Sequence, residues 1–265
     1  MTRRTRVLIV GSGAGGATTA YTLARAGLDV VVIEEGFRPP IVDGKRETIA
    51  AMRLLYRRGG MTPIMGRIPL GYVEGRCLGG STEINSGFWH RIPRETLMRW
   101  ETQFDLHETS EDLLKPHFEW AENILGVGMH PKEWPESTRL FAKGIEAMGW
   151  TYHQVPRTAP GCINSNNCAN GCPVGAKQGM TCRLLPEAEK CGARILTGCR
   201  VQLIQHRRHC ATAVIAQQKK LDGSRELVEI AADHVFVCAG PTETPALLIR
   251  SGIRRCVGNS LRIHP

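Results

Sequence analysis

The sequence predicts an α/β fold: a parallel sheet that continues into an antiparallel β-meander, with an irregular and helical insertion. Three observations support this prediction. Residues 6–33 have the order strand, glycine-rich turn, helix, strand, which implies two parallel strands joined by a right-handed crossover. Three short alternating apolar runs between residues 201 and 231 indicate a meander, and residues 91–180 combine helix signals with many loop residues.

The first βαβ unit is the most regular part of the sequence. Arg6–Val10 is a short apolar run of the kind that forms a buried parallel strand. Ala17–Ala26 places small and apolar residues at helical spacing, and Gly27 stands where a helix C-cap glycine belongs. Val30–Ile33 is then expected to be the second strand.

The middle of the chain is less regular. Gly36–Gly75 is rich in Gly, Pro and Arg and contains one helical stretch near Arg46–Arg58. Helices are expected at Thr109–Leu125 and Ser137–Met148, and Pro156–Gly179 has the composition of a loop.

The last part returns to regular elements. Arg183–Lys190 is a helix candidate, and the alternating runs follow it, with Asp222-Gly223 as a hairpin turn between the last two. His234–Gly240 predicts a further buried strand, and the helix after it begins at Pro241. We therefore expect residues 1–90 and 181–265 to be two parts of one domain, with residues 91–180 as a helical and loop insertion that carries a cysteine-rich segment.

Composition and charge exclude several classes of protein. The 265 residues are 42% hydrophobic and 22% charged, as in globular proteins and unlike disordered or fibrous ones. The longest apolar runs are far shorter than the roughly 20 residues that span a bilayer, so no transmembrane segment is expected. The net charge is 34 − 25 = +9, but the basic residues are scattered and lack interleaved aromatics, which argues against a nucleic-acid partner.

The N-terminus predicts the compartment. Its arginines and apolar run imitate a secretory signal, but the run passes directly into a glycine motif and therefore indicates a first strand. We expect a cytoplasmic protein, either free or in a membrane-associated complex.

A dinucleotide-binding motif follows the first strand. In Gly11-x-Gly13-x-x-Gly16 the first glycine permits a tight turn, the second leaves room for a pyrophosphate at the helix N-terminus, and the third allows close packing of helix and strand. Glu34 stands 18 residues after Gly16, at the end of the second strand, where its carboxylate can accept hydrogen bonds from a ribose. The motif alone fits FAD and NAD equally well.

Four further motifs occur in order along the chain. They are Val31–Gly36, Gly75–Asn85, Val237–Gly240 with Pro245–Ile253, and Gly258–Pro265. Together they resemble the glucose-methanol-choline (GMC) flavoprotein oxidoreductases, and the resemblance extends from residue 7 to the last residue.

The resemblance implies FAD held across a Rossmann-type FAD-binding domain. In the family, the positions matching the first glycines and Glu34 hold the ADP half of FAD, the second glycine segment passes the pyrophosphate and the flavin ring, and a valine lies near the adenine. The implied FAD-binding residues are Gly11, Ser12, Gly13, Gly15, Gly16, Glu34, Gly79, Gly80, Ser81, Asn85, Val201, Ala239 and Gly240.

The implied activity is hydride transfer from the CH–OH group of an alcohol, sterol or sugar to FAD. The catalytic histidine of the family lies in a C-terminal half of the fold, and His264 matches a structural motif instead. We therefore assign no catalytic residue and expect this chain to be the N-terminal, FAD-binding half, with the C-terminal half absent. The alternatives are a non-catalytic FAD- or nucleotide-binding fragment, and an NAD-dependent dehydrogenase, which would leave residues 75–85 unexplained.

Three of the ten cysteines form a separate pattern. Cys162, Cys168 and Cys172-Pro173 fit a bacterial ferredoxin spacing in which Ser165 replaces the second cysteine. They would then ligate a 3Fe-4S cluster, and the chain would be the flavin half of an iron-sulfur-linked dehydrogenase with an electron-acceptor subunit. The alternative is packing, because Gly171–Lys177 also resembles sterol and long-chain alcohol oxidases without such a cluster. Zinc is disfavoured, since the loop offers no fourth ligand.

Overall fold

The computed structural model describes residues 3–40, 44–208, 210–220 and 222–261. Its contacts divide the chain into two compact units. Residues 1–84 and 179–265 form the first, called the sheet unit below, and residues 85–178 form the second, called the insertion unit. The domain boundaries expected at residues 90 and 180 stay a prediction.

The sheet unit contains one sheet with the strand order β5-β2-β1-β8-β7-β6. The first four strands in this order are parallel, whereas β7 is antiparallel to both of its neighbours. The predicted parallel sheet with a β-meander is therefore confirmed. The strands are β1 (Arg3–Val10), β2 (Val30–Ile33), β5 (Arg194–Leu196), β6 (Cys199–Arg207), β7 (Cys210–Lys219) and β8 (Arg225–Val237).

Strand β8 joins the two halves of this sheet. Its first half pairs antiparallel with β7, from Arg225 to Ala231, and its second half pairs in parallel with β1, from Ile230 to Val237. The sequence predicted two strands here, which was wrong because no turn-forming Gly or Pro interrupts residues 231–234. One continuous strand therefore carries the meander onto the parallel sheet.

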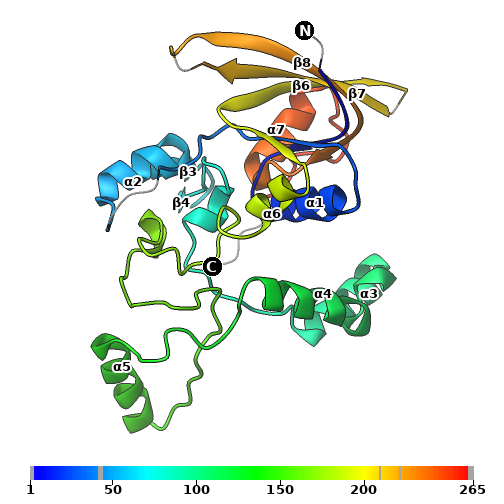
Figure 1. Ribbon diagram of the computed structural model, residues 1–265. Helices are drawn as coiled ribbons and strands as arrows, with labels where there is room; N and C mark the ends of the chain where they lie inside the picture. The colour runs from blue at the N-terminus through cyan, green and yellow to red at the C-terminus, as the bar shows by residue number, and fades with distance from the viewer. Residues whose placement is uncertain (1–2, 41–43, 209, 221, 262–265) are drawn as a thin grey trace. The chain divides into compact units, whose positions relative to one another are not determined.

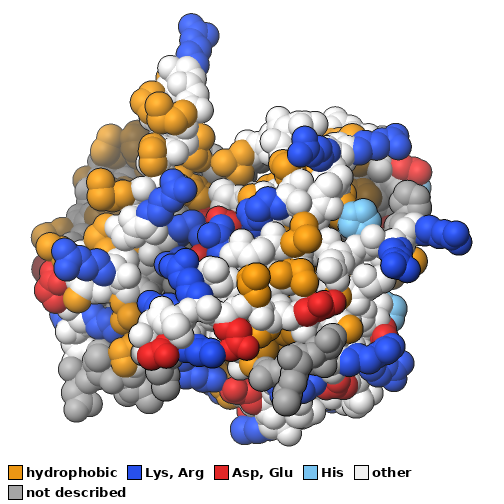
Figure 2. Space-filling model, turned by 90° about the horizontal axis from the view of Figure 1, so that it is seen from above, with side chains coloured by type: hydrophobic (Ala, Val, Ile, Leu, Met, Phe, Trp, Pro, Cys, Tyr) orange, Lys and Arg blue, Asp and Glu red, His pale blue; other side chains and the backbone are white. Residues whose placement is uncertain are grey.

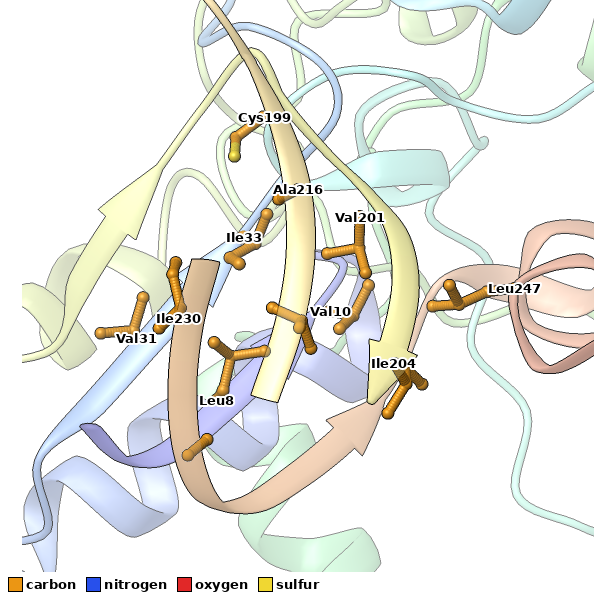
Figure 3. Packing of buried hydrophobic residues seen from close by; sticks show 12 residues of the cluster. Leu8, Val10, Val31, Ile33, Cys199, Val201, Ile204, Ala216, Ile230 and Leu247 are labelled. Carbon is orange, nitrogen blue, oxygen red and sulfur yellow. The ribbon is translucent and has the colours of Figure 1, made fainter. Parts of the chain in front are cut away.

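Apolar side chains fill both faces of the parallel strands. Leu8 and Ile33 belong to a cluster that also includes residues of the meander and Leu247 of α7, and the side chains labelled in Figure 3 occupy this space. Ile9 and Val32 point to the opposite face, where they pack with α1 and α6. Because successive residues of a strand face opposite sides, burial of both faces requires the uninterrupted apolar runs seen in β1 and β2.

Helices α1 and α6 lie side by side on one face of the sheet (Figure 1). No helix among the described residues is long and apolar enough to cross a membrane. The helices are α1 (Ala14–Arg25), α2 (Thr48–Leu55), α3 (Arg94–Phe104), α4 (Glu111–Ile124), α5 (Glu136–Ala147), α6 (Leu184–Lys190) and α7 (Gly240–Arg250), and a small hairpin is formed by β3 (Thr62–Ile64) and β4 (Leu70–Tyr72).

The insertion unit holds α3, α4 and α5. Leu97 is the buried residue of α3, Ala142 is that of α5, and α4 has none among its described residues. Helix α3 was not predicted, and its small burial does not explain this, because α4 and α5 bury no more side chains and were predicted. On the face shown in Figure 2, Lys and Arg side chains are dispersed among acidic, apolar and uncharged ones instead of forming one basic tract.

Candidate functional site

The turn between β1 and α1 brings three backbone segments into close contact. The Gly11 N–H donates to the carbonyl of Ile33 at 2.8 Å, which ties the turn to the end of β2. Gly11 has φ +96°, and a Cβ there would lie 2.4 Å from the carbonyl oxygen of Cys238; a Cβ on Gly16 would lie 1.9 Å from the Gly11 oxygen. A residue with a side chain at either position would therefore force β1, α1 and the end of β8 apart.

The N-terminus of α1 offers backbone donors to an anion. Gly13 is the N-cap residue and has no side chain that could satisfy the first helical N–H groups. Ala14 and Gly15 are exposed. Because the helix dipole also places positive potential at this end, its chemistry suits an anion such as a pyrophosphate.

Glu34 lies at the end of β2, and only 7% of it is exposed. Its Oε2 accepts hydrogen bonds from the Ser12 N–H at 3.0 Å and from the Ser12 Oγ at 2.6 Å, and its Oε1 accepts one from the Gly36 N–H at 2.8 Å. Burial raises the pKa of Glu34 above its ordinary value, against the hydrogen bonds from Ser12 and Gly36, which lower it. A carboxylate can accept about four hydrogen bonds, so one acceptor position is left for a ribose hydroxyl.

The second glycine segment packs directly on the first. The Gly79 N–H donates to the Ser12 Oγ at 3.0 Å, and a Cβ on Gly80 would lie 3.2 Å from the Gly13 Cα. Ser81 accepts a hydrogen bond from the Gly75 N–H at 2.9 Å. The Ser12 hydroxyl, with no exposed surface, therefore links Glu34 to the second glycine segment, a role that the motif alone did not reveal.

The other predicted FAD-binding residues of the sheet unit belong to β6 and to the start of α7. The Cys238 N–H donates to the Val10 carbonyl at 2.7 Å, and Ala239 is the N-cap of α7, which begins at Gly240. Val201 is 5% exposed and packs in the apolar cluster of Figure 3. Asn85, by contrast, belongs to the insertion unit.

Asn85 makes its contacts within that unit. Its Oδ1 accepts a hydrogen bond from the Gly87 N–H at 3.2 Å, and its backbone carbonyl accepts one from the Lys177 Nζ at 2.8 Å. The C-terminal motif residues 262–265, including His264, lie outside the described residues.

These contacts fit the adenosine diphosphate part of a dinucleotide. Glycines at the close approaches leave bare backbone for a pyrophosphate, α1 supplies donors for its charge, and Glu34 supplies an oriented acceptor for a ribose. The structure therefore brings Gly11, Ser12, Gly13, Gly15, Gly16, Glu34, Gly79, Gly80 and Ser81 together.

A cluster of charged residues beside this cradle was missed by sequence reasoning. Its members come from five separate segments, so no local sequence pattern indicates them. They are Glu35, Arg57, Glu74, Arg76, Arg200 and Glu243.

The predicted metal ligands do not form a metal centre. The described residues contain no group of three His, Cys, Asp or Glu side chains that could hold a metal ion. Cys162, Cys168 and Cys172 instead line a small pocket with apolar side chains that include Ile163 and Val174. The Arg157 Nη2 donates to the Cys168 Sγ at 3.2 Å. The 3Fe-4S cluster that the spacing predicted therefore has no support among the described residues, and packing of these cysteines stays the alternative prediction.

Comparison with known families decides the classification. The family model described as GMC oxidoreductase matches residues 52–265. The chain belongs to the GMC oxidoreductase family. A model described as NAD(P)-binding Rossmann-like domain matches residues 9–39, which contain the first glycine motif and Glu34.

Relatives within the GMC family match nearly all of this chain. An uncharacterised GMC-type oxidoreductase of Sinorhizobium fredii is 39% identical over 258 residues, which are 97% of this chain and 51% of that protein. A long-chain-alcohol oxidase of Arabidopsis thaliana is 29% identical over 271 residues, 98% of this chain and 36% of that protein. The chain therefore spans about half or less of the length of these relatives.

A solved structure shows the same fold. Pyridoxine 4-oxidase from Mesorbium loti superposes with a TM-score of 0.68 at 20% identity, over 94% of this chain and 52% of that one. At this identity the likeness concerns the fold alone, and it agrees with the Rossmann-like sheet described above.

Proposed function

We propose that this chain binds FAD and forms the nucleotide-holding part of an oxidoreductase that acts on CH–OH groups of donors. The observation that carries the proposal is the convergence at Ser12. Its N–H and hydroxyl both donate to Glu34, while the same hydroxyl accepts the Gly79 N–H. One buried side chain thereby fixes the ribose-binding acid against the second glycine segment.

Each part of the cradle has a separate task. The N-terminal N–H groups of α1 would hold the pyrophosphate, and Glu34 would accept a hydrogen bond from the adenosine ribose. Gly79, Gly80 and Ser81 would pass close to the pyrophosphate and the flavin, with Asn85, Val201, Ala239 and Gly240 as further contacts. When bound, FAD supplies the acceptor for the hydride that leaves the alcohol carbon.

The names of related proteins support the donor class. One relative, 29% identical, is a long-chain-alcohol oxidase. We propose an alcohol as the donor, with sterols and sugars as the other classes to test. No residue of this chain is assigned as the base that removes the hydroxyl proton.

Calorimetric titration of the full chain with FAD, ADP and NAD⁺ tests the binding part of the proposal. We expect saturable binding of FAD and ADP. Glu34→Gln should weaken both about tenfold or more, because it removes a charge-assisted hydrogen bond. Glu189→Gln, which neutralises an exposed acid of α6 paired with Arg38, is the matched control and should bind like the wild type.

Two results would contradict this part. Absence of saturable FAD binding removes the cofactor assignment, and tighter binding of NAD⁺ than of FAD favours an NAD-dependent dehydrogenase. The donor class is tested by mixing the FAD-loaded protein anaerobically with long-chain alcohols, sterols and sugars. Bleaching of the flavin absorbance supports an oxidoreductase, whereas unchanged absorbance with every donor favours a nucleotide-binding module.

A further inference from the structure

We infer that Arg57 positions the adenosine end of the cofactor site, because it holds the segments that carry the predicted FAD contacts in one ion network. The inference rests on the proposed function, but it concerns a residue outside every glycine motif. Arg57 follows α2, in the short helical turn at residues 57–60.

Arg57 contacts three carboxylates from three separate segments. Its Nε pairs with Glu74, its Nη1 lies 3.2 Å from Glu35 Oε2, and the same Nη1 lies 3.3 Å from Glu243 Oε1. Its side chain is 16% exposed. Although burial opposes the charge, the three carboxylates hold the pKa of Arg57 above its ordinary value. The planar guanidinium, with five donors, can serve three acids at once, which an ammonium group cannot do in the same geometry.

Two further arginines extend the network. Arg76 Nε lies 2.7 Å from Glu35 Oε1, and Arg200 Nη2 lies 3.2 Å from Glu243 Oε2. Arg200 also reaches Glu35, with 3.7 Å between Nε and Oε2. Coulombic attraction from Arg57, Arg76 and Arg200 keeps the pKa of Glu35 below its ordinary value, although burial, the largest single influence, acts in the opposite direction.

Glu74 also accepts two hydrogen bonds from neighbouring hydroxyl groups. Its Oε2 accepts from the Thr242 hydroxyl at 2.7 Å and from the Tyr72 hydroxyl at 3.2 Å. Burial and the neighbouring Glu74 raise the pKa of Tyr72 to about 12, so this phenol stays a donor at neutral pH. Glu74, itself 6% exposed, therefore ties the hairpin strand β4 to the first turn of α7.

Four members of the network are neighbours in sequence of the predicted FAD contacts. Each of the four lies one to three residues from such a contact, in a different segment. The pairs are Glu35 with Glu34, Arg200 with Val201, Arg76 with Gly79, and Glu243 with Gly240. Movement of any of these four would therefore displace a wall of the proposed cofactor site, and Arg57 is bonded to two of them, Glu35 and Glu243.

Loss of Arg57 is expected to weaken nucleotide binding as well as to destabilise the fold. Three arginines balance three glutamates in the intact network, so removal of Arg57 leaves one uncompensated negative charge among partly buried acids that then repel one another. Removal of one partner from a buried ion network usually lowers the stability of the fold, so binding is compared where every variant is folded. In the folded variant the segments would also spend less time in the arrangement that accepts a nucleotide, and the apparent dissociation constant rises as that fraction falls.

The test compares Arg57→Met, Arg57→Lys and Arg4→Met with the wild type. Arg4 forms an exposed ion pair with Asp233 in the same unit, so its replacement removes the same charge without touching the network. Titration at a temperature where all variants are folded gives dissociation constants for FAD and ADP. We expect Arg57→Met to weaken both by about tenfold or more and by similar factors, Arg57→Lys to recover part of the loss, and Arg4→Met to stay within about twofold.

The outcomes separate this inference from the proposed function. A wild type that binds neither FAD nor ADP overturns both. A wild type that binds, with Arg57→Met unchanged or with only its melting temperature lowered, overturns the role of Arg57 alone. If Arg57→Met does not fold, Glu243→Gln replaces it, because this variant keeps Arg57 and removes the ion pairs of Glu243 with Arg57 and Arg200; unchanged affinity for ADP in that variant also overturns the inference.

Discussion

Replacement of Ser12 by alanine tests the connection between the two glycine segments. Ser12 is fully buried; its hydroxyl donates to Glu34 Oε2 at 2.6 Å and accepts the Gly79 N–H at 3.0 Å. Alanine fits the same space without a clash. Ser12→Ala therefore removes two hydrogen bonds and requires no change in the backbone of either glycine segment.

The magnitude follows from what each partner loses. A hydrogen bond to a charged group contributes about 1.5–3 kcal/mol, and a buried N–H left without an acceptor costs about 1–3 kcal/mol. Because the two effects share one site and partial rearrangement relieves both, we expect a loss of about 2–4 kcal/mol in the free energy of unfolding. Glu34 would also lose a group that lowers its pKa, so the penalty should grow as pH rises.

Urea unfolding at pH 7 and 25 °C measures this loss. Ser224→Ala is a matched control, since the Ser224 hydroxyl also donates to a carboxylate oxygen, Asp222 Oδ1, at 2.6 Å, but in an exposed turn. We expect that control to lose less than about 0.5 kcal/mol. Equal losses in the two variants would refute the view that the buried Ser12 hydroxyl joins the segments.

Three other predictions concern the same chain. Gly80→Ala should weaken FAD binding by more than Gly27→Ala does, because both positions have positive φ but only the Cβ at Gly80 meets backbone, 3.2 Å from Gly13 Cα; equal affinities by calorimetry would contradict this. Burial raises the pKa of Glu34 above 4.5, so the stability that its protonated form contributes is complete below about pH 4.5 and is lost as pH rises through the folded-state pKa. Urea unfolding between pH 4.5 and 8 should therefore show the wild type losing stability relative to Glu34→Gln. Parallel curves of unfolding free energy against pH for the two proteins would be evidence against a raised pKa of Glu34. Protein purified under argon should hold no stoichiometric iron by mass spectrometry, and a triple serine variant at Cys162, Cys168 and Cys172 should retain its affinity for FAD; iron that disappears in this variant would contradict the packing interpretation.

The regular part of the fold could be predicted because its signals are local. Buried parallel strands need apolar residues on both faces, so Val7–Val10 and Val30–Ile33 stand out in the sequence. The continuity of β8 was missed although no Gly or Pro interrupts residues 231–234, and its two halves pair with different strands, β7 and β1. Helix α3 was missed, although α4 and α5, which bury no more side chains, were predicted.

The candidate site likewise has residues that the sequence predicted and residues that it did not. Gly11, Gly13, Gly16 and Glu34 were found because a short motif imposes their spacing. Arg57 was not, because its partners range from Glu35 to Glu243 and meet only in the folded chain.

The cysteine segment carries a prediction, the 3Fe-4S cluster, that has no support among the described residues. Its spacing matched a ferredoxin pattern, yet the contact of Arg157 with the Cys168 sulfur depends on packing that spacing does not encode.

The visible absorption spectrum of the purified chain, recorded anaerobically before and after dithionite, tests the central claim most directly. The proposed FAD site predicts flavin bands that bleach on reduction and that return a stoichiometry near one flavin per chain when free FAD is supplied and the excess removed. A folded but colourless protein that still retains no flavin after incubation with FAD would contradict the assignment of the Ser12-centred cradle as an FAD site.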